Sequence, residues 1–238
     1  MCEKQGYIER FYIDEPNDRV DATILDMQRY TKIQTVGLCH SVQVCAETLY
    51  ESLGLELPKD RIEKIAGINH MAWLLEIKDK DGNDLYPMLR EKAKNFNNPE
   101  CDNLVRLDYL NKFGYYVTES SEHNAEYNPF YIKSNYPELI EKFNIPLDEY
   151  PRRCVNQIAG WQKQYEELMS GGKIEHTRSL EYASHIMEAI YTNAPYKIGG
   201  NVLNRGLIPN LPYDACVEVL IFRNNRLTDK KHYFINGT

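Results

Sequence analysis

The stretch Ile33-Gln-Thr-Val-Gly-Leu-Cys-His-Ser-Val42 contains the first change of regular structure in this chain. Residues 33–38 have the β-branched composition of a short strand. From Ser41 to Leu55 the pattern becomes helical, because apolar residues recur at spacings of three and four, and Ser41 is the expected N-cap. The sequence therefore places Cys39 and His40 where a strand gives way to a helix, a common position for functional side chains.

The rest of the chain predicts a mixed α+β domain in which helices pack on antiparallel strands. Residues 1–24 are polar and irregular, residues 64–77 are strand-like, and Asp81-Gly82 marks a hairpin-type turn. The pattern is helical over residues 85–94, 102–112, 135–143, 151–170 and 179–193, and it favours β structure over 196–222.

Composition and charge exclude several classes of protein. The chain has 238 residues and a net charge of −7, with no basic stripe, which argues against a nucleic-acid binder. No apolar run approaches the roughly 18 residues of a membrane span, and the N-terminus lacks a signal peptide, so we expect a cytoplasmic protein without membrane association. The six scattered cysteines then indicate free thiols.

Cys39 and His70 are candidate ligands for a divalent metal, because thiolate and imidazole both suit borderline ions. Two protein ligands would leave positions open for substrate oxygens and water. The ordinary alternative is a buried thiol and a hydrogen-bonded histidine in unrelated places. A nucleophilic pair of Cys39 with His40 is disfavoured, because neighbouring side chains on a strand point to opposite faces.

Two further stretches are rich in polar side chains. Residues 115–127 combine carboxylates, a histidine and phenols that could supply a general base or hold substrate hydroxyls. Alone they favour a solvated helix face, with Glu119 paired to His123 and Glu122 paired to Glu126. Residues 201–219 carry many amides that suit sugar hydroxyls and equally suit ordinary turns.

Four ordered strings together resemble glycoside hydrolase family 4. They are Thr35-Val-Gly-Leu-Cys-His-Ser-Val-Gln43, Ala66-Gly-Ile-Asn-His-Met-Ala-Trp73, Thr118-Glu-Ser-Ser-Glu-His-Asn-Ala-Glu-Tyr-Asn-Pro-Phe130 and Asn204-Arg-Gly-Leu-Ile-Pro-Asn-Leu-Pro-Tyr-Asp-Ala-Cys-Val-Glu218. The residues after the metal cysteine track the substrate in this family. Cys39-His-Ser-Val42 resembles the α-galactosidase group and differs from the phospho-glycosidases, which carry Asp or Asn after the cysteine.

This resemblance implies the lactate-dehydrogenase-like C-terminal α+β domain of the family and an unusual hydrolysis of α-galactosides. NAD⁺ oxidises the sugar C3 hydroxyl, a base removes the C2 proton, the aglycone leaves by elimination, water adds, and the ketone is reduced again. A divalent metal, usually Mn²⁺, holds the C2 and C3 oxygens as a Lewis acid. The implied cofactors are NAD and Mn²⁺, the implied partner is an α-galactoside, and the implied assembly is a homo-oligomer.

Carried over residue by residue, the resemblance assigns metal ligands, catalytic groups and substrate contacts. Tyr127 is the expected base for the C2 proton, and the nearby Glu119, Glu122 and His123 are the alternatives to it. No position can be assigned to cofactor binding. The assigned residues are Cys39 and His70 as metal ligands, His40 and Tyr127 as catalytic groups (Tyr127 as the C2 base), and Asn69, Asn204 and Arg205 as substrate contacts.

The chain also departs from the family pattern. It has no G-x-G-x-x-G after a strand, so the resemblance implies that the N-terminal Rossmann domain is missing and that the chain alone does not turn over. We expect an irregular remnant over residues 1–29, the metal and substrate domain over 30–219 and an atypical tail over 220–238. The alternatives are a catalytically inactive metal- or sugar-binding fragment, and specificity for α-glucosides or α-galacturonides.

Overall fold

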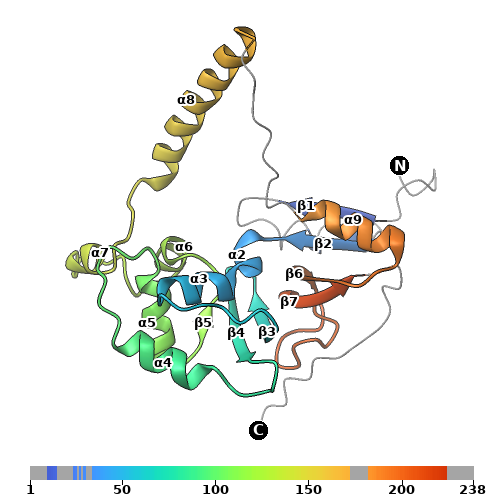
Figure 1. Cartoon of the computed structure of the whole chain (residues 1–238), viewed down its shortest axis with the longest axis horizontal. Coiled ribbons are helices and arrows are strands. Elements are labelled where there is room, and N and C mark those ends of the chain that lie inside the picture. Colours follow the sequence, from blue (N-terminus) through green and yellow to red (C-terminus); the bar gives the residue numbers. More distant parts are fainter. Residues whose placement is uncertain are drawn as a thin grey trace.

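The computed structural model describes residues 10–14, 24, 25, 27, 29, 30, 34–171 and 182–223. Within these residues a seven-stranded sheet has the order β1-β2-β6-β7-β3-β4-β5. Its strands are β1 (Arg10–Asp14), β2 (Gln34–Leu38), β3 (Ile62–Ile68), β4 (Met71–Lys78), β5 (Tyr116–Val117), β6 (Tyr196–Leu203) and β7 (Cys216–Arg223). The helices are α2 (His40–Gln43), α3 (Cys45–Ser52), α4 (Tyr86–Lys94), α5 (Leu104–Phe113), α6 (Ser121–Tyr127), α7 (Glu138–Lys142), α8 (Glu149–Met169) and α9 (Ala183–Thr192), as Figure 1 shows.

The sheet is antiparallel except for the parallel pair β1 and β2. β2 meets β6 at a single residue pair, Gly37 with Asn201. β7 lies between β6 and β3, so that Glu218 pairs with Asn201 on one side and with Gly67 on the other. This order brings the end of β2, the β3–β4 turn and the end of β5 together, although they are far apart in the sequence.

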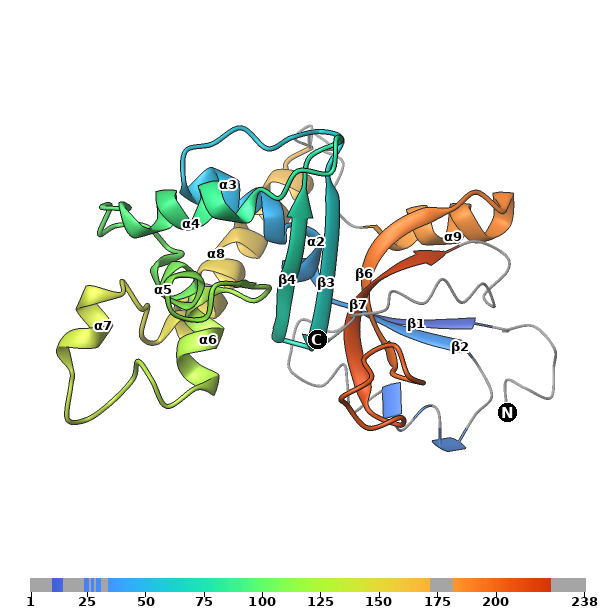
Figure 2. The same cartoon turned by 90° about the horizontal axis from the view of Figure 1, so that it is seen from below.

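Helices pack against both ends and faces of this sheet, as the two views show (Figures 1 and 2). Leu49 of α3, Leu89 of α4 and Leu110 of α5 form one core with Leu74 of β4. A second core joins Ile186 of α9 to β2 and β6. The expected α+β fold is therefore confirmed, with apolar helix stripes buried on antiparallel strands.

The structure corrects the expectations at the N-terminus and the C-terminal tail. Residues 10–14 form β1, where an irregular segment was expected, because their backbone pairs with β2 in a tertiary contact that local sequence does not reveal. β7 continues to Arg223, paired with Tyr196, so the expected boundary at residue 219 falls inside a strand. Ser179, the expected cap of α9, lies outside the described residues.

Two expectations near the site also change. The helix expected from Ser41 to Leu55 is divided at Val44 into α2 and α3, and Cys39 stands at its N-cap position. Residues 64–77 form two strands joined by a turn at Asn69 and His70. The turn carries no Asn-Gly signal, and His70 itself takes the left-handed conformation with φ of 64°.

The long helix α8 stands away from the body of the molecule (Figure 1). Its 21 residues include no buried side chain. An exposed apolar stripe runs along α8 at alternating spacings of three and four residues, as in a helix that packs on another helix. The stripe consists of Ile158, Trp161, Tyr165 and Leu168. Within the described residues no helix has both the length and the apolar character to cross a membrane.

Candidate metal centre

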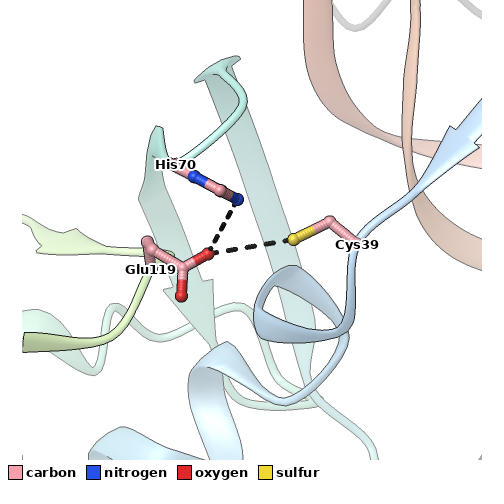
Figure 3. A group of neighbouring side chains, drawn as sticks. All are labelled: Cys39, His70 and Glu119. Carbon is pink, nitrogen blue, oxygen red and sulfur yellow. Dashed lines mark hydrogen bonds and ion pairs between the residues drawn. The ribbon is translucent and has the colours of Figure 1, made fainter. Parts of the chain in front are cut away.

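Three side chains from separate elements converge at one end of the sheet. Ligand atoms of Cys39, His70 and Glu119 all lie within 4.8 Å of one another. Figure 3 shows the thiol and the imidazole both facing the Glu119 carboxylate. Oε2 of Glu119 is 3.3 Å from Nε2 of His70 and 3.9 Å from Sγ of Cys39.

Cys39 is held where β2 ends and α2 begins. Nε2 of Gln43 donates to the Cys39 carbonyl at 3.2 Å, and the Tyr182 hydroxyl donates to the same carbonyl at 3.0 Å. The Gln43 amide also donates to the Gly199 carbonyl at 2.7 Å and accepts from the Gly199 N–H at 2.9 Å. α2 approaches β6 so closely that a Cβ at Gly199 would lie 2.5 Å from a methyl of Val42. The backbone around Cys39 is therefore fixed by α2, β6 and the residue before α9.

His70 is presented by the turn between β3 and β4. A histidine with a left-handed backbone is uncommon, and such conformations cluster at functional sites. The His70 ring stacks against those of Tyr127 and His123, with centroids 5.6 Å and 5.7 Å away and interplanar angles of 11° and 8°. The turn and these two rings of α6 set the direction of the imidazole.

Glu119 is the second residue after β5, and its side chain is 5% exposed. The buried guanidinium of Arg106 donates to the carbonyls of Val117 and Thr118, at 3.0 Å and 3.1 Å from Nη2, and so fixes the preceding backbone. Oε1 of Glu119 accepts from the Ser41 hydroxyl and from the Ser120 N–H, both at 2.7 Å. These bonds occupy one carboxylate oxygen and direct the other toward the cluster.

The donor set fits a divalent cation. With metal–ligand bonds of about 2.0–2.3 Å, donors of one coordination sphere lie about 3–4.5 Å apart. The Glu119 carboxylate meets this range with His70 at 3.3 Å and with Cys39 at 3.9 Å, and all three donors lie within 4.8 Å of one another. Burial, followed by the charges of Glu218 and Glu119, raises the pKa of the Cys39 thiol to about 12. Without a cation the thiol therefore keeps its proton and can donate it to Glu119, whereas a cation would replace that proton.

The expected catalytic residues lie next to different members of this cluster, Tyr127 beside His70 and His40 beside Cys39 in the chain. Tyr127, the last residue of α6, is 42% exposed and stacks directly on His70. His40 is exposed at the first position of α2, and its ring meets that of Tyr182 edge-on at 5.6 Å. Among the expected substrate contacts, Asn69 neighbours His70 and donates from Nδ2 to Glu218 at 3.0 Å.

Asn204 and Arg205 begin the loop after β6. The Asn204 side chain is 0% exposed, and its amide donates to the carbonyls of Ile208, Leu211 and Pro212. Its Oδ1 accepts from the Ile208 N–H at 2.7 Å. The structure therefore uses Asn204 to close this loop, while Arg205 is exposed beside it with φ of 44°.

The sequence did not identify Glu218 as a site residue, and it identified Glu119 only as an alternative C2 base, not as a member of the metal cluster. The expected pairing of Glu119 with His123 on a helix face is wrong, because α6 begins at Ser121, after Glu119. The Ser120 hydroxyl accepts from the His123 N–H, so a serine cap three residues before His123 was the signal available in the sequence. The expected Glu122–Glu126 pairing also changes, since Glu126 bonds Nδ1 of His123 at 2.9 Å.

Fold and site together define an α+β domain with a candidate three-donor divalent-metal centre. The C-terminal domain of family 4 glycosyl hydrolases matches residues 65–226 of the chain. The chain is 59% identical to the Bacillus subtilis alpha-galactosidase over 194 residues, which is 81% of this chain and 44% of the relative. A Rhizobium meliloti alpha-galactosidase is 34% identical over 201 residues, 79% of this chain and 40% of the relative. The chain belongs to family 4 of the glycosyl hydrolases and spans less than half the length of these relatives.

Solved structures agree with this fold. The crystal structure described as the Bacillus subtilis glucosidase LplD superposes with a TM-score of 0.74 at 21% identity, over 93% of this chain and 55% of that one. A 6-phospho-alpha-glucosidase from gut microorganisms, solved with NAD and Mn²⁺, gives a TM-score of 0.61 at 16% identity, over 90% of this chain and 51% of that one. These superpositions support the fold, and the family match over residues 65–226 with the 59% identity to an alpha-galactosidase confirms the sequence resemblance to family 4.

Proposed function

We propose that this chain is the metal- and substrate-binding part of an NAD- and Mn²⁺-dependent α-galactosidase. The observation that carries the proposal is the Cys39–His70–Glu119 cluster in a chain 59% identical to an alpha-galactosidase. Thiolate, imidazole and carboxylate together provide three donors, which leaves coordination positions for two neighbouring sugar hydroxyls.

When bound, Mn²⁺ supplies Lewis-acid polarisation of the sugar oxygens and NAD supplies the hydride acceptor and donor. Cys39, His70 and Glu119 hold the cation at the end of the sheet. Tyr127, as its phenolate, takes the C2 proton and becomes the phenol, since its ring stacks on the imidazole ligand and remains accessible. His40, the residue after Cys39, donates a proton to the departing aglycone oxygen.

The sugar is placed by residues around the cluster. Asn69 contacts substrate or metal-bound water beside His70, and Arg205 contacts sugar or cofactor from a loop that Asn204 holds closed. The residues Cys39-His-Ser-Val42 favour a galactoside. Family relatives include an alpha-galacturonidase from Thermoanaerobacter italicus, 25% identical over 216 residues, so competition between galactosides, glucosides and galacturonides decides the specificity.

We also propose that the protein is a cytoplasmic homo-oligomer. The described cysteines (Cys39, Cys45, Cys101, Cys154 and Cys216) are free, as a reducing compartment would keep them. The exposed apolar stripe of α8 offers a surface that a second copy could bury. Sedimentation of the chain and of a Trp161→Glu variant tests the assembly, because a charge in the stripe should dissociate it.

The metal site is tested by titrating Mn²⁺ into the chain and into Cys39→Ser. We expect the Kd for Mn²⁺ to rise at least about tenfold in Cys39→Ser, which is about 1.4 kcal/mol. Cys154→Ser on α8 is the matched control and should bind as the parent chain does. Equal Mn²⁺ binding by all three proteins, or none by the parent chain, would refute the proposed site.

Substrate binding separates an enzyme part from a remnant that only binds metal. The parent chain loaded with Mn²⁺ should bind methyl α-galactoside more tightly than methyl α-glucoside, and Tyr127→Phe should retain this binding because only a proton acceptor is lost. Metal binding without any sugar binding would instead support an inactive metal-binding fragment.

A further inference from the structure

Glu218 lies between the two segments that carry His70 and Glu119. Its side chain is 1% exposed. Oε1 accepts from Nδ2 of Asn69 at 3.0 Å, and Asn69 immediately precedes His70. Oε2 accepts from the Thr118 hydroxyl at 3.1 Å, and Thr118 immediately precedes Glu119. One carboxylate is thus bonded to the neighbour of each ligand.

The backbone of Glu218 is well suited to hold two other segments in place. It lies on β7, between β6 and β3, and pairs with Asn201 and Gly67. β3 leads directly into the turn that presents His70. Side chains on the interior strands of a sheet hold a site more accurately than those on loops. The two oxygens of Glu218 therefore set the separation of the β3–β4 turn and the end of β5.

A buried carboxylate is costly, and hydrogen bonds such as those from Asn69 and Thr118 offset part of that cost. A divalent cation held next to the same segments would stabilise the carboxylate further. Residues outside the coordination sphere that orient ligands commonly change metal affinity by about 10–100-fold when they are replaced.

We propose that Glu218 is a positioning residue of the metal centre: it fixes His70 relative to Glu119 through Asn69 and Thr118, and its negative charge strengthens cation binding. This inference rests on the metal site proposed above. It assigns a role to a carboxylate outside the three-donor cluster, and it predicts that replacing Glu218 alters metal affinity and coordination geometry.

The experiment measures Mn²⁺ affinity and the Co²⁺ spectrum of the 238-residue chain, Glu218→Gln and Glu63→Gln. Glu63→Gln is the matched control, because Glu63 is a nearly buried carboxylate of β3 that pairs with Arg61 and Lys197. Glu218→Gln should weaken Mn²⁺ binding by about 10–100-fold and shift the thiolate-to-Co²⁺ charge-transfer band. Glu63→Gln should leave both unchanged, whatever its effect on thermal stability.

Thr118→Val provides a second variant, because it removes one hydrogen bond, keeps the carboxylate and replaces a buried hydroxyl by a methyl group. It should weaken Mn²⁺ binding severalfold, and it decides the question if Glu218→Gln does not fold. Parent-like affinity and spectrum in the folded variants, or equal losses in Glu63→Gln, would overturn the role of Glu218 while leaving the Cys39-dependent site intact. Absence of Cys39-dependent binding in the parent chain would overturn both.

Discussion

Replacing Gly199 by alanine should displace Cys39 without touching it. The new Cβ would lie 2.5 Å and 2.6 Å from the two methyl groups of Val42 and 3.1 Å from its Cβ. Non-bonded carbon atoms normally stay about 3.5 Å or more apart, so α2 or β6 must move by about 1 Å. Overpacking of this kind costs about 1–3 kcal/mol. Because Cys39 is the N-cap residue of α2, part of that movement reaches the thiol.

Gly200→Ala is the matched control for this prediction. Its Cβ would meet Val36 at 2.8 Å and Ile221 at 2.9 Å, on the other face of the same strand. Urea denaturation should show a loss of unfolding free energy in both variants, of about 1–3 kcal/mol each. The Mn²⁺ affinity should fall severalfold in Gly199→Ala alone, because the atoms nearest the new Cβ belong to α2 at Gly199 and to β2 and β7 at Gly200.

A double variant that removes the clash provides the decisive measurement of Mn²⁺ affinity. In Gly199→Ala with Val42→Ala, the two offending methyl groups are gone, so the double variant should recover most of the lost Mn²⁺ affinity. A favourable coupling free energy of about 1 kcal/mol is expected between the two substitutions. Equal Mn²⁺ affinities in Gly199→Ala and Gly200→Ala, or no recovery in the double variant, would refute the link from β6 through α2 to Cys39.

Three further predictions concern buried polar groups. Arg106→Met should lower the unfolding free energy by about 2–4 kcal/mol in urea titrations and weaken Mn²⁺ binding, because the carbonyls of Val117 and Thr118 lose their buried donor; an unchanged Mn²⁺ affinity would contradict its influence on Glu119. Asn204→Ala should cost about 2–4 kcal/mol, visible as a lower Tm, since its amide holds the 204–212 loop, whereas exposed Asn210→Ala should change the Tm little. Burial raises the pKa of the Cys45 thiol from 9.0 to about 12, so the folded protein favours the protonated form. The unfolding free energy that this pKa difference contributes is complete below pH 9 and is lost as the pH rises toward 12. The loss is up to about 1.4 kcal/mol per pH unit. Cys45→Ala should reduce this loss, measured by urea titrations at pH 8 and pH 10.5.

Elements with a strong local period could be predicted from the sequence. The strand before Cys39 and the helices α4, α5 and α9 follow the spacing of their apolar residues, which is a property of a short window. Cys39 and His70 could be identified as partners only through the family resemblance. Their meeting depends on β7 lying between β6 and β3, a long-range arrangement that no local pattern encodes.

Glu119 was missed as a metal donor because of its local sequence, and Glu218 was missed because its contacts are long-range. A helix-face interpretation began α6 too early, although Ser120 is a good N-cap and places Glu119 before the helix. Glu218 lies among the apolar residues of β7 and has no distinctive neighbour in the sequence. Its bonds to Asn69 and Thr118 cross about 150 and 100 positions, so only the folded sheet reveals them.

The double hydrogen bond between Gln43 and Gly199 has a consequence for the sheet itself. A side-chain amide that both donates to and accepts from one residue reproduces the bonding of a neighbouring strand. β2 pairs with β6 only at Gly37 and then turns away, and Gln43 occupies the place that β2 vacates. β2 and β6 can therefore separate after Gly37 while the N–H and carbonyl of Gly199 remain hydrogen-bonded. The chain leaves the sheet at Cys39, and Gln43, four residues later, supplies the hydrogen bonds that β2 no longer makes.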